Sequence, residues 1–308
     1  MIYVLSVTSP IFIIVLVGYF ATRSNIVSKS DIQALGSFVI RFALPALIFR
    51  SLSQRSFVEI INLDYLTVYI IGSLSTFVLI FASARFRGRS TTASAIFAMG
   101  SSVSNSGFIG YPVAVLVLGP PAVVALAMTM MVENILMIPL GLVVAEVGCN
   151  HGKKNIYRVF HGVTFRLAKN PLIIAILAGT AMSLSGLALP SALFRAVDMF
   201  AMASGAVALF FVGGTLVGLR VTGMMVDVGR IVGGKLFLHP TMIFLALFLV
   251  PSIDPTLKKA MLIFSSVPVV TIFSLLGRPY GQQDVCAAAL MVATIISFVT
   301  ISCLLLVL

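Results

Sequence analysis

The chain has 308 residues, of which 60% are hydrophobic and 9% are charged, and its mean hydropathy is +1.15. Because soluble proteins carry about 25% charged residues, this composition excludes an ordinary soluble domain and predicts an integral membrane protein in contact with the lipid bilayer. A formal net charge of +11 is typical of some nucleic-acid-binding proteins. Here, however, the basic residues lie in short connections between apolar runs, where they orient membrane segments, so we expect no nucleic acid among its partners.

Apolar runs follow one another along the whole chain, and a run of about 20 apolar residues is long enough to cross a bilayer. The first run has no basic residue before it and Arg23 and Lys29 after it, which is the reverse of the charge order in a signal peptide. The sequence therefore predicts an all-α membrane protein with ten spans, at residues 2–22, 34–53, 64–84, 93–117, 121–146, 170–189, 195–219, 229–250, 257–277 and 284–307.

The basic residues favour alternate connections. Fourteen of the twenty, Lys235 among them, are counted with the connections after odd-numbered spans and five with those after even-numbered spans, while Arg41 is counted inside a span. Positively charged connections stay in the cytoplasm, so both termini are predicted to lie outside.

The longest connection, residues 148–169, divides the ten spans into a first repeat, 1–147, and a second repeat, 170–308. Each repeat has five spans, and because five is odd the second repeat enters the membrane with the opposite orientation. This arrangement is the inverted repeat of many secondary transporters. We expect the connection itself to be cytoplasmic.

Two spans at matching places in the repeats are interrupted by residues that break helices. Span four contains SNSGFIGYP, which is Ser104 to Pro112, and span nine contains Ser265, Ser266 and Pro268. Backbone groups freed by glycine and proline are tolerated in lipid only where they line a cavity or contact protein. The ends of two half-helices that point into such a cavity favour an anion. The breaks therefore predict a transporter's binding site.

We expect the site residues to come from these two breaks. Asn105 either binds the substrate or satisfies a freed backbone carbonyl, and the two prolines mark either the crossing of the spans or simple kinks. The candidate residues for substrate binding are Ser104, Asn105, Ser106, Gly107, Pro112, Pro268, Thr271 and Ser274.

Three of the ionisable residues inside predicted spans are considered for a role. Glu133 is a candidate for coupling transport to an ion, because a carboxylate deep in a span is costly, and its alternative is a structural hydrogen bond made as the protonated acid. Arg41 either extends to the interface or supplies positive charge near the cavity. His239 is interpreted as a packed polar residue rather than a proton carrier.

Other classes of protein find little support. The three cysteines have no metal-ligand spacing, and the motifs of hydrolases and nucleotide-binding enzymes are missing from the sequence, so we expect no enzyme activity and no cofactor. A receptor for a small organic anion and a cation-proton exchanger of similar architecture stay open as alternatives to a transporter.

At the helix breaks and in several neighbouring spans the chain resembles the auxin efflux carrier family, which includes plant PIN-type carriers and bacterial malonate-transporter-like permeases. The motifs that carry the resemblance are FALPALIFRSL in span two, SNSGFIGYPV in span four, MVENILMIPLG in span five and SGAVALFFVGGTL in span seven. It implies an elevator-type secondary transporter of small organic anions. Spans one, two, six and seven would form a scaffold that dimerises, spans three to five and eight to ten would form the moving transport domain, and Asn105 would contribute to the substrate site. A bacterial inner (plasma) membrane is the expected location.

Span nine departs from the family pattern. Many relatives have an asparagine a few residues after the proline that matches Pro268, whereas this chain has Thr271 and Ser274 in the segment PVVTIFS. Their hydroxyl groups would replace the second amide, which leaves the identity of the anion open.

Overall fold

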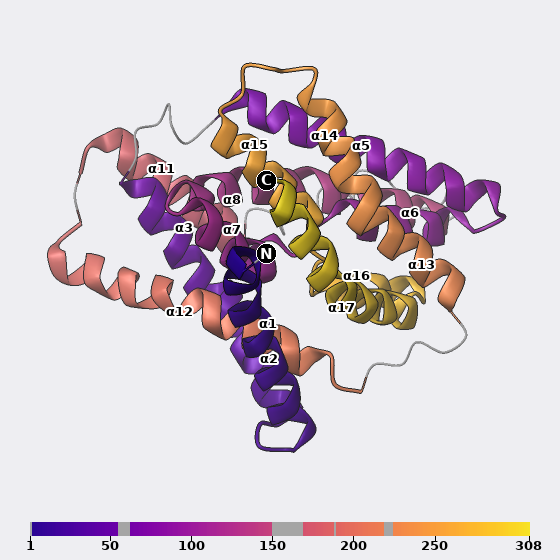
Figure 1. Ribbon diagram of the computed structural model, residues 1–308, viewed down its shortest axis with the longest axis horizontal. Helices are drawn as coiled ribbons and strands as arrows, with labels where there is room; N and C mark the ends of the chain where they lie inside the picture. The colour runs from indigo at the N-terminus through magenta and orange to yellow at the C-terminus, as the bar shows by residue number, and fades with distance from the viewer. Residues whose placement is uncertain (1, 55–61, 150–168, 188, 219–223) are drawn as a thin grey trace. The chain divides into compact units, whose positions relative to one another are not determined.

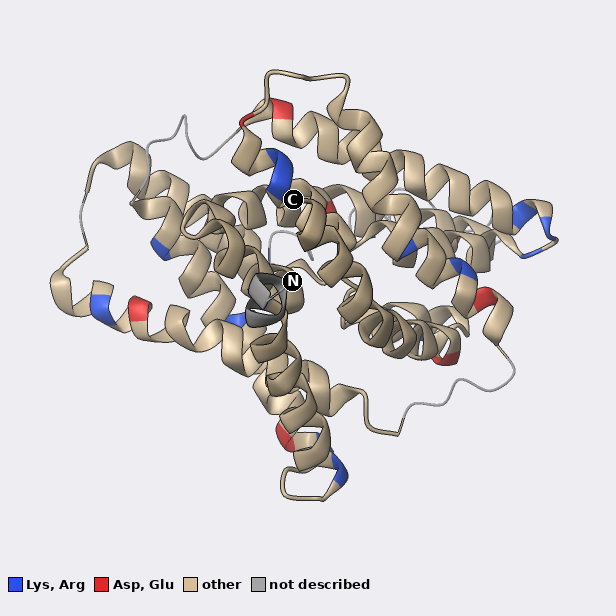
Figure 2. Ribbon diagram, in the orientation of Figure 1, with Lys and Arg blue, Asp and Glu red and all other residues tan. Residues whose placement is uncertain are grey.

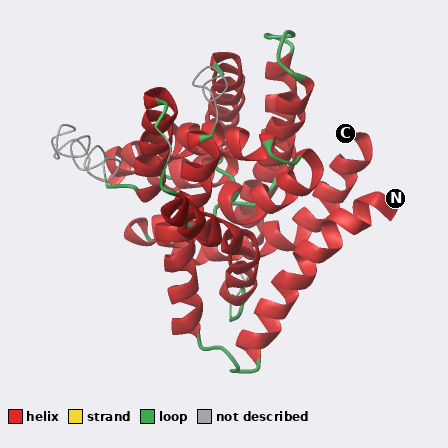
Figure 3. Cartoon of the chain, turned by 90° about the vertical axis from the view of Figure 1, so that its left-hand side faces the viewer, coloured by secondary structure: helices red, strands yellow, loops and turns green. Residues whose placement is uncertain are grey.

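The computed structural model describes residues 2–54, 62–149, 169–187, 189–218 and 224–308, with side chains from residue 8 onward. In these ranges the chain is built of helices joined by loops, as Figures 1 and 3 show. The one β-type pairing among them is an isolated bridge between Ser104 and Val269. The prediction of an all-α protein is thus confirmed.

A helix, or a series of helices, lies in each of the ten ranges expected to span the membrane (Figure 1). Most of the connection 148–169 lies outside the described residues. The bounds are α1 Ile2–Arg23, α2 Lys29–Phe38, η1 Val39–Ala43, α3 Leu44–Ser53, α5 Leu63–Phe86, α6 Thr91–Ser102, η2 Ser106–Gly110, α7 Tyr111–Leu118, α8 Pro121–Met131, η3 Val132–Met137, α9 Ile138–Cys149, α11 Pro171–Ser185, α12 Ser191–Thr215, α13 Met225–Gly233, η4 Gly234–Leu238, α14 His239–Leu247, α15 Pro255–Ser266, α16 Phe273–Gly277, η5 Arg278–Tyr280 and α17 Gln283–Val307.

The helices have the length and surface of membrane spans. Within the described ranges, six helical stretches are long and apolar enough to cross a bilayer, and shorter apolar helices accompany them. Large apolar side chains such as Leu16, Phe20 and Leu177 are more than half exposed, which is stable only where lipid replaces water. Among the described residues, the charged ones lie mostly near helix ends and in connections (Figure 2). The protein is an integral membrane protein.

Proline shapes the long spans. The four π-helical turns, η1, η2, η3 and η4, each end shortly before a proline, namely Pro45, Pro112, Pro139 and Pro240. Proline donates no backbone hydrogen bond and its ring crowds the preceding turn, so the helix widens there instead of breaking. Because a widened turn contains an extra residue, the side chains that follow it face the interior at other positions than they would in a regular helix.

The described chain forms two compact units. The first comprises Met1–Leu63, Gly107–Met128 and Leu167–Val217, and the second comprises Asp64–Ser106, Thr129–Arg166 and Gly218–Leu308. Each unit takes segments from both halves of the chain, so neither half is a compact body of its own. The inverted repeat stays a prediction about symmetry.

In the first unit, small residues let helix backbones approach closely. Gly213 of α12 lies against the backbone oxygen of Val15 in α1, and Gly18 of α1 lies against the backbone oxygen of Phe210 in α12. A side chain at either glycine would overlap that oxygen. Such close contact is how membrane helices gain packing energy where no hydrophobic effect drives them together.

The core of the second unit contains buried aromatic side chains whose hydroxyl groups form hydrogen bonds inside the protein. Tyr65 and Tyr69 of α5 are fully buried and stack on each other, with ring centroids 6.0 Å apart. The Tyr65 hydroxyl makes a 2.6 Å hydrogen bond with Thr129 of α8. On another side of this unit, Gly100 of α6 leaves room for the ring of Phe273. This packing fixes the helices that surround the breaks.

Candidate functional site

The two predicted breaks meet in the second unit. Helix α6 ends at Ser102 and α15 ends at Ser266, and in both the next residue has extended backbone angles. Ser104 pairs with Val269 in an antiparallel bridge, and the backbone N–H of Asn105 donates to the carbonyl of Pro268 over 2.8 Å. Each break therefore satisfies backbone groups that the other leaves open, which is the condition for non-helical backbone inside a membrane.

The Asn105 side chain joins the breaks a second time. Its amide nitrogen donates to the hydroxyl of Thr271 over 2.7 Å, although the residue is only 1% exposed. The amide oxygen has no hydrogen-bond partner among the described residues. A buried polar atom without a partner is costly and rare. The amide nitrogen donates to a side-chain hydroxyl and not to a freed backbone carbonyl, and a substrate-binding role for Asn105 stays a prediction.

Glu133 lies in the π-helical turn η3 and holds the first break. Its carboxylate accepts hydrogen bonds from the backbone N–H of Ser104 at 3.0 Å, from the hydroxyl of Ser106 at 2.9 Å and from the hydroxyl of Tyr69 at 3.5 Å. Ser106 begins η2, the second helix of span four. Glu133 therefore occupies this helix start, where the sequence had placed the substrate anion.

Two residues that the sequence did not assign to the site lie at the second break. Lys235 is fully buried in η4 and donates to the carbonyl of Ser265 over 2.6 Å and to Nδ1 of His239 over 2.8 Å. A protonated Lys235 can only donate, which assigns the acceptor role to Nδ1 and the ring proton to Nε2, 3.0 Å from the Ser73 hydroxyl oxygen. From the sequence, Lys235 was counted among the basic residues of the connection after span seven and was therefore not considered as a site residue. It is nevertheless embedded in the apolar segment GGKLFLHP of span eight.

The remaining candidates are placed less centrally. Gly107 and Pro112 are buried and belong to the first unit, and Ser274 is half-buried in α16. Arg41 is exposed, which agrees with its extending to an interface rather than into a cavity. No group of three or more His, Cys, Asp or Glu residues in the described ranges is placed to hold a metal ion.

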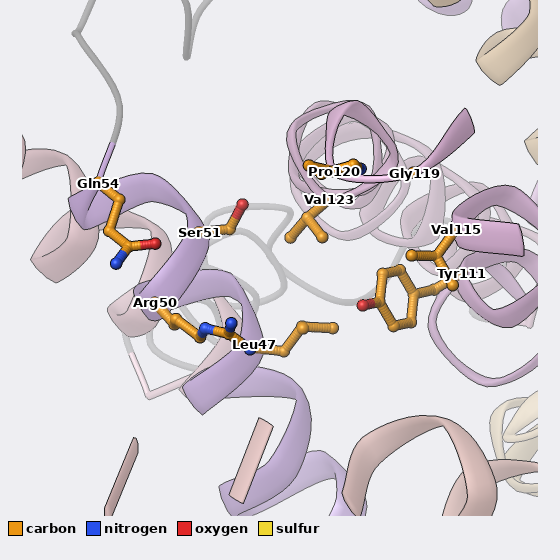
Figure 4. A pocket seen from close by; sticks show the side chains of 9 residues that line it. All are labelled: Leu47, Arg50, Ser51, Gln54, Tyr111, Val115, Gly119, Pro120 and Val123. Carbon is orange, nitrogen blue, oxygen red and sulfur yellow. The ribbon is translucent and has the colours of Figure 1, made fainter. Parts of the chain in front are cut away.

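A separate cavity of about 520 Å³ lies in the first unit (Figure 4). Its wall combines one basic group and several polar groups with aliphatic side chains, and Figure 4 shows the Tyr111 hydroxyl directed into it. The Arg50 guanidinium at its edge forms a 2.6 Å ion pair with Asp198 of α12. The lining residues are Leu47, Arg50, Ser51, Gln54, Tyr111, Val115, Gly119, Pro120 and Val123.

Broken helices that meet at a buried amide, in a chain of long apolar helices, define a membrane transport protein. Comparison with known proteins agrees: a family model described as "Membrane transport protein" matches residues 3–305, so the chain belongs to that family, the auxin efflux carrier family. The resemblance drawn from the motifs is confirmed, as is the expectation that the chain is a transporter rather than an enzyme.

Individual relatives differ in what their names state. The chain is 29% identical over 299 residues to a protein of Rhizobium meliloti (strain 1021) named "Putative malonate transporter", covering 96% of this chain and 93% of that protein. It is 29% identical to the "Uncharacterized transporter YfdV" of Escherichia coli (strain K12), over 67% of each chain. It is 28% identical to the "Lysosomal cholesterol signaling protein" of Mus musculus, over 67% of this chain and 25% of that protein.

Proposed function

We propose that this protein is a secondary transporter of small organic anions that binds its substrate where the breaks of spans four and nine meet. The observation that carries the proposal is the Asn105 amide, which is buried where the breaks meet and uses one of its two N–H groups for the bond to Thr271, so that the other N–H can donate to a carboxylate. The site offers hydrogen bonds from both breaks to one small ligand. The relative named as a malonate transporter, similar over nearly its whole length, supports a carboxylate as that ligand.

The transport mechanism follows from the expected symmetry. Ten spans in two inverted repeats, with both termini outside, would let a transport domain move against a scaffold and expose the site to each side in turn. Spans one, two, six and seven would form the scaffold and its dimer contact. The natural place for such a chain is a bacterial plasma membrane.

The cavity of the first unit adds a second surface for the same chemistry. Arg50 supplies positive charge, Tyr111 supplies a hydroxyl group, and aliphatic side chains line the rest. A carboxylate on an apolar body fits such a lining, since ligand pockets are mostly apolar with a few orienting polar groups.

Uptake into liposomes tests the proposal. Purified protein is reconstituted, and uptake of labelled monocarboxylates and dicarboxylates is measured with proton and sodium gradients imposed separately. We expect saturable uptake of at least one carboxylate, and Asn105→Ala should reduce it. Absence of uptake for the whole panel by folded protein would contradict a transport function.

A receptor is the second candidate, because one relative is named as a signaling protein. A receptor would bind a ligand at the breaks without moving it. Carboxylate binding in detergent together with no uptake in liposomes would favour this alternative.

A further inference from the structure

The two helix breaks are held by buried side chains of opposite charge. Glu133 receives hydrogen bonds from Ser104 and Ser106, where the second helix of span four begins. Lys235 donates to the carbonyl of Ser265, where the first helix of span nine ends. A carboxylate thus lies at a helix start and an ammonium group at a helix end.

This placement follows the partial charges of the backbone. The start of a helix carries unpaired N–H groups and positive charge, and its end carries unpaired carbonyl groups and negative charge. Each side chain therefore satisfies its own break. Both lie in π-helical turns that precede a proline, in η3 and η4, so the same backbone device turns each of them toward the interior.

One buried cluster connects the two charges. Tyr69 donates to Glu133, and its ring contacts the ring of His239 edge to face, with centroids 5.8 Å apart. His239 in turn accepts a hydrogen bond from Lys235, so Tyr69 and His239 link the two charged groups by direct contacts. Tyr65, stacked on Tyr69, is the further titratable group in this cluster among the described residues.

The net charge of the cluster constrains what can bind beside it. With Glu133 ionised and Lys235 protonated, the empty site is neutral. A bound monoanion leaves it at minus one and a dianion such as malonate at pH 7.5 leaves it at minus two, which is costly in a site closed from water. If one proton moves onto the Glu133 carboxylate as the anion binds, the excess negative charge falls by one and Lys235 becomes the counter-ion of the anion.

We propose that the Glu133 and Lys235 pair makes this protein a proton–anion symporter, in which Glu133 takes up one proton for each anion bound and Lys235 balances the charge of that anion. The inference rests on the function proposed above and adds its energy coupling. When the anion binds, one proton from the aqueous phase on that side adds to a Glu133 oxygen; when the anion leaves on the other side, the same O–H bond breaks and the proton is released there, with every other covalent bond unchanged.

Calorimetric titration of the detergent-solubilised full chain with malonate at pH 7.5 tests the sign of each charge. Glu133→Gln imitates the protonated acid, so it should tighten malonate binding, roughly tenfold for one charge removed nearby. Lys235→Met should weaken binding by a similar factor, and the double variant should return close to the wild type. If both single variants weaken binding, the two residues have a purely structural role and the proposal is wrong.

Proton uptake gives a readout that folding defects in Lys235→Met cannot obscure. Malonate binding to the wild type is measured in two buffers of different ionisation enthalpy, which yields the number of protons taken up. We expect about one proton per malonate for the wild type and none for Glu133→Gln. No proton uptake by the wild type would overturn the proposal.

The failure of this inference is distinguishable from failure of the proposed function. If Asn105→Ala weakens malonate binding while the wild type takes up no proton, the site stands and only the coupling is wrong. If malonate and every monocarboxylate of the uptake panel fail to bind, the proposed function falls, and the symport mechanism falls with it.

Discussion

The amide of Asn105 and the hydroxyl of Thr271 form a 2.7 Å hydrogen bond that joins two helix breaks 166 residues apart in the chain. The bond uses one of the two amide hydrogens and leaves the amide oxygen unpaired. Thr271 occupies the region where the family resemblance leads one to expect an asparagine. Threonine supplies a hydroxyl group and a methyl group there, so the second half of this site is smaller and less polar than a pair of facing amides.

Asn105→Ala should weaken carboxylate binding. The change removes both hydrogen-bonding functions of the amide but keeps a small residue that membrane helices tolerate well. A hydrogen bond to a charged ligand is worth roughly 1.5 to 3 kcal/mol, so the affinity should fall about ten- to a hundredfold. Calorimetry on solubilised protein measures the change.

Ser102→Ala is the matched control for Asn105. Its hydroxyl donates to the carbonyl of Ala98 within its own helix at 2.9 Å, so its loss should leave anion affinity nearly unchanged. Equal affinity of wild type and Asn105→Ala, at an unchanged melting temperature, would mean that the broken helix is structural and that the anion binds elsewhere.

Sequence reasoning located the breaks but not the contacts between them. Glycine and proline in an apolar run reveal where a helix cannot continue, and this signal is local, so the breaks near Asn105 and Pro268 were predictable. The bond from Asn105 to Thr271 depends on the packing of distant helices, which periodicity does not encode. The sequence offered Ser274 and Thr271 equally as hydroxyl groups for the site. In the structure Thr271 precedes α16 and bonds to Asn105, whereas Ser274 lies within α16.

Lys235 shows a different limit of the sequence. The positive-inside rule treats a basic residue near the end of a span as part of the connection, and Lys235 follows two glycines close to that end. The π-helical turn before Pro240 turns it inward, toward His239 and Ser265. A glutamate deep in span five could have signalled a buried cation, because a buried charge needs a partner.

Glu133→Gln should abolish the dependence of uptake on a pH gradient. Glutamine keeps the size of the side chain but cannot exchange a proton, while the ionisable groups near it, Tyr69, Lys235 and His239, stay in place. Uptake of labelled malonate into liposomes is compared with and without an imposed proton gradient. If the folded Glu133→Gln variant still responds to the gradient as the wild type does, Glu133 has a structural role.

Membrane orientation can be tested with single cysteines. We expect Arg87→Cys, in the basic connection between α5 and α6, to be cytoplasmic and Ser252→Cys, between α14 and α15, to lie outside. An impermeant maleimide added to intact cells should therefore label Ser252→Cys and spare Arg87→Cys. The exposed Cys149 and Cys303 are first replaced by serine. The reverse labelling pattern would invert the predicted topology.

Asp198→Asn should change anion binding more than it changes stability. The ion pair with Arg50 is partly exposed, with side chains 38% and 33% accessible, and such pairs contribute about 0 to 1 kcal/mol. Removing the carboxylate frees the Arg50 guanidinium at the cavity. If the cavity binds carboxylates, affinity should rise severalfold in Asp198→Asn and fall in Arg50→Gln. Unchanged affinity in both variants would remove the cavity from the transport route.

Gly213→Ala should destabilise the first unit. A methyl group at this position would overlap the backbone oxygen of Val15, so α1 and α12 would have to separate. Forcing a methyl group into a close contact costs about 1 to 3 kcal/mol, and the melting temperature of the solubilised protein should fall accordingly. Gly229→Ala in α13 is the matched control, because open space surrounds it and alanine is the better helix former by about 1 kcal/mol. It should leave the melting temperature unchanged or raise it. A melting temperature for Gly213→Ala equal to that of Gly229→Ala would show that the close approach of α1 and α12 contributes little to stability.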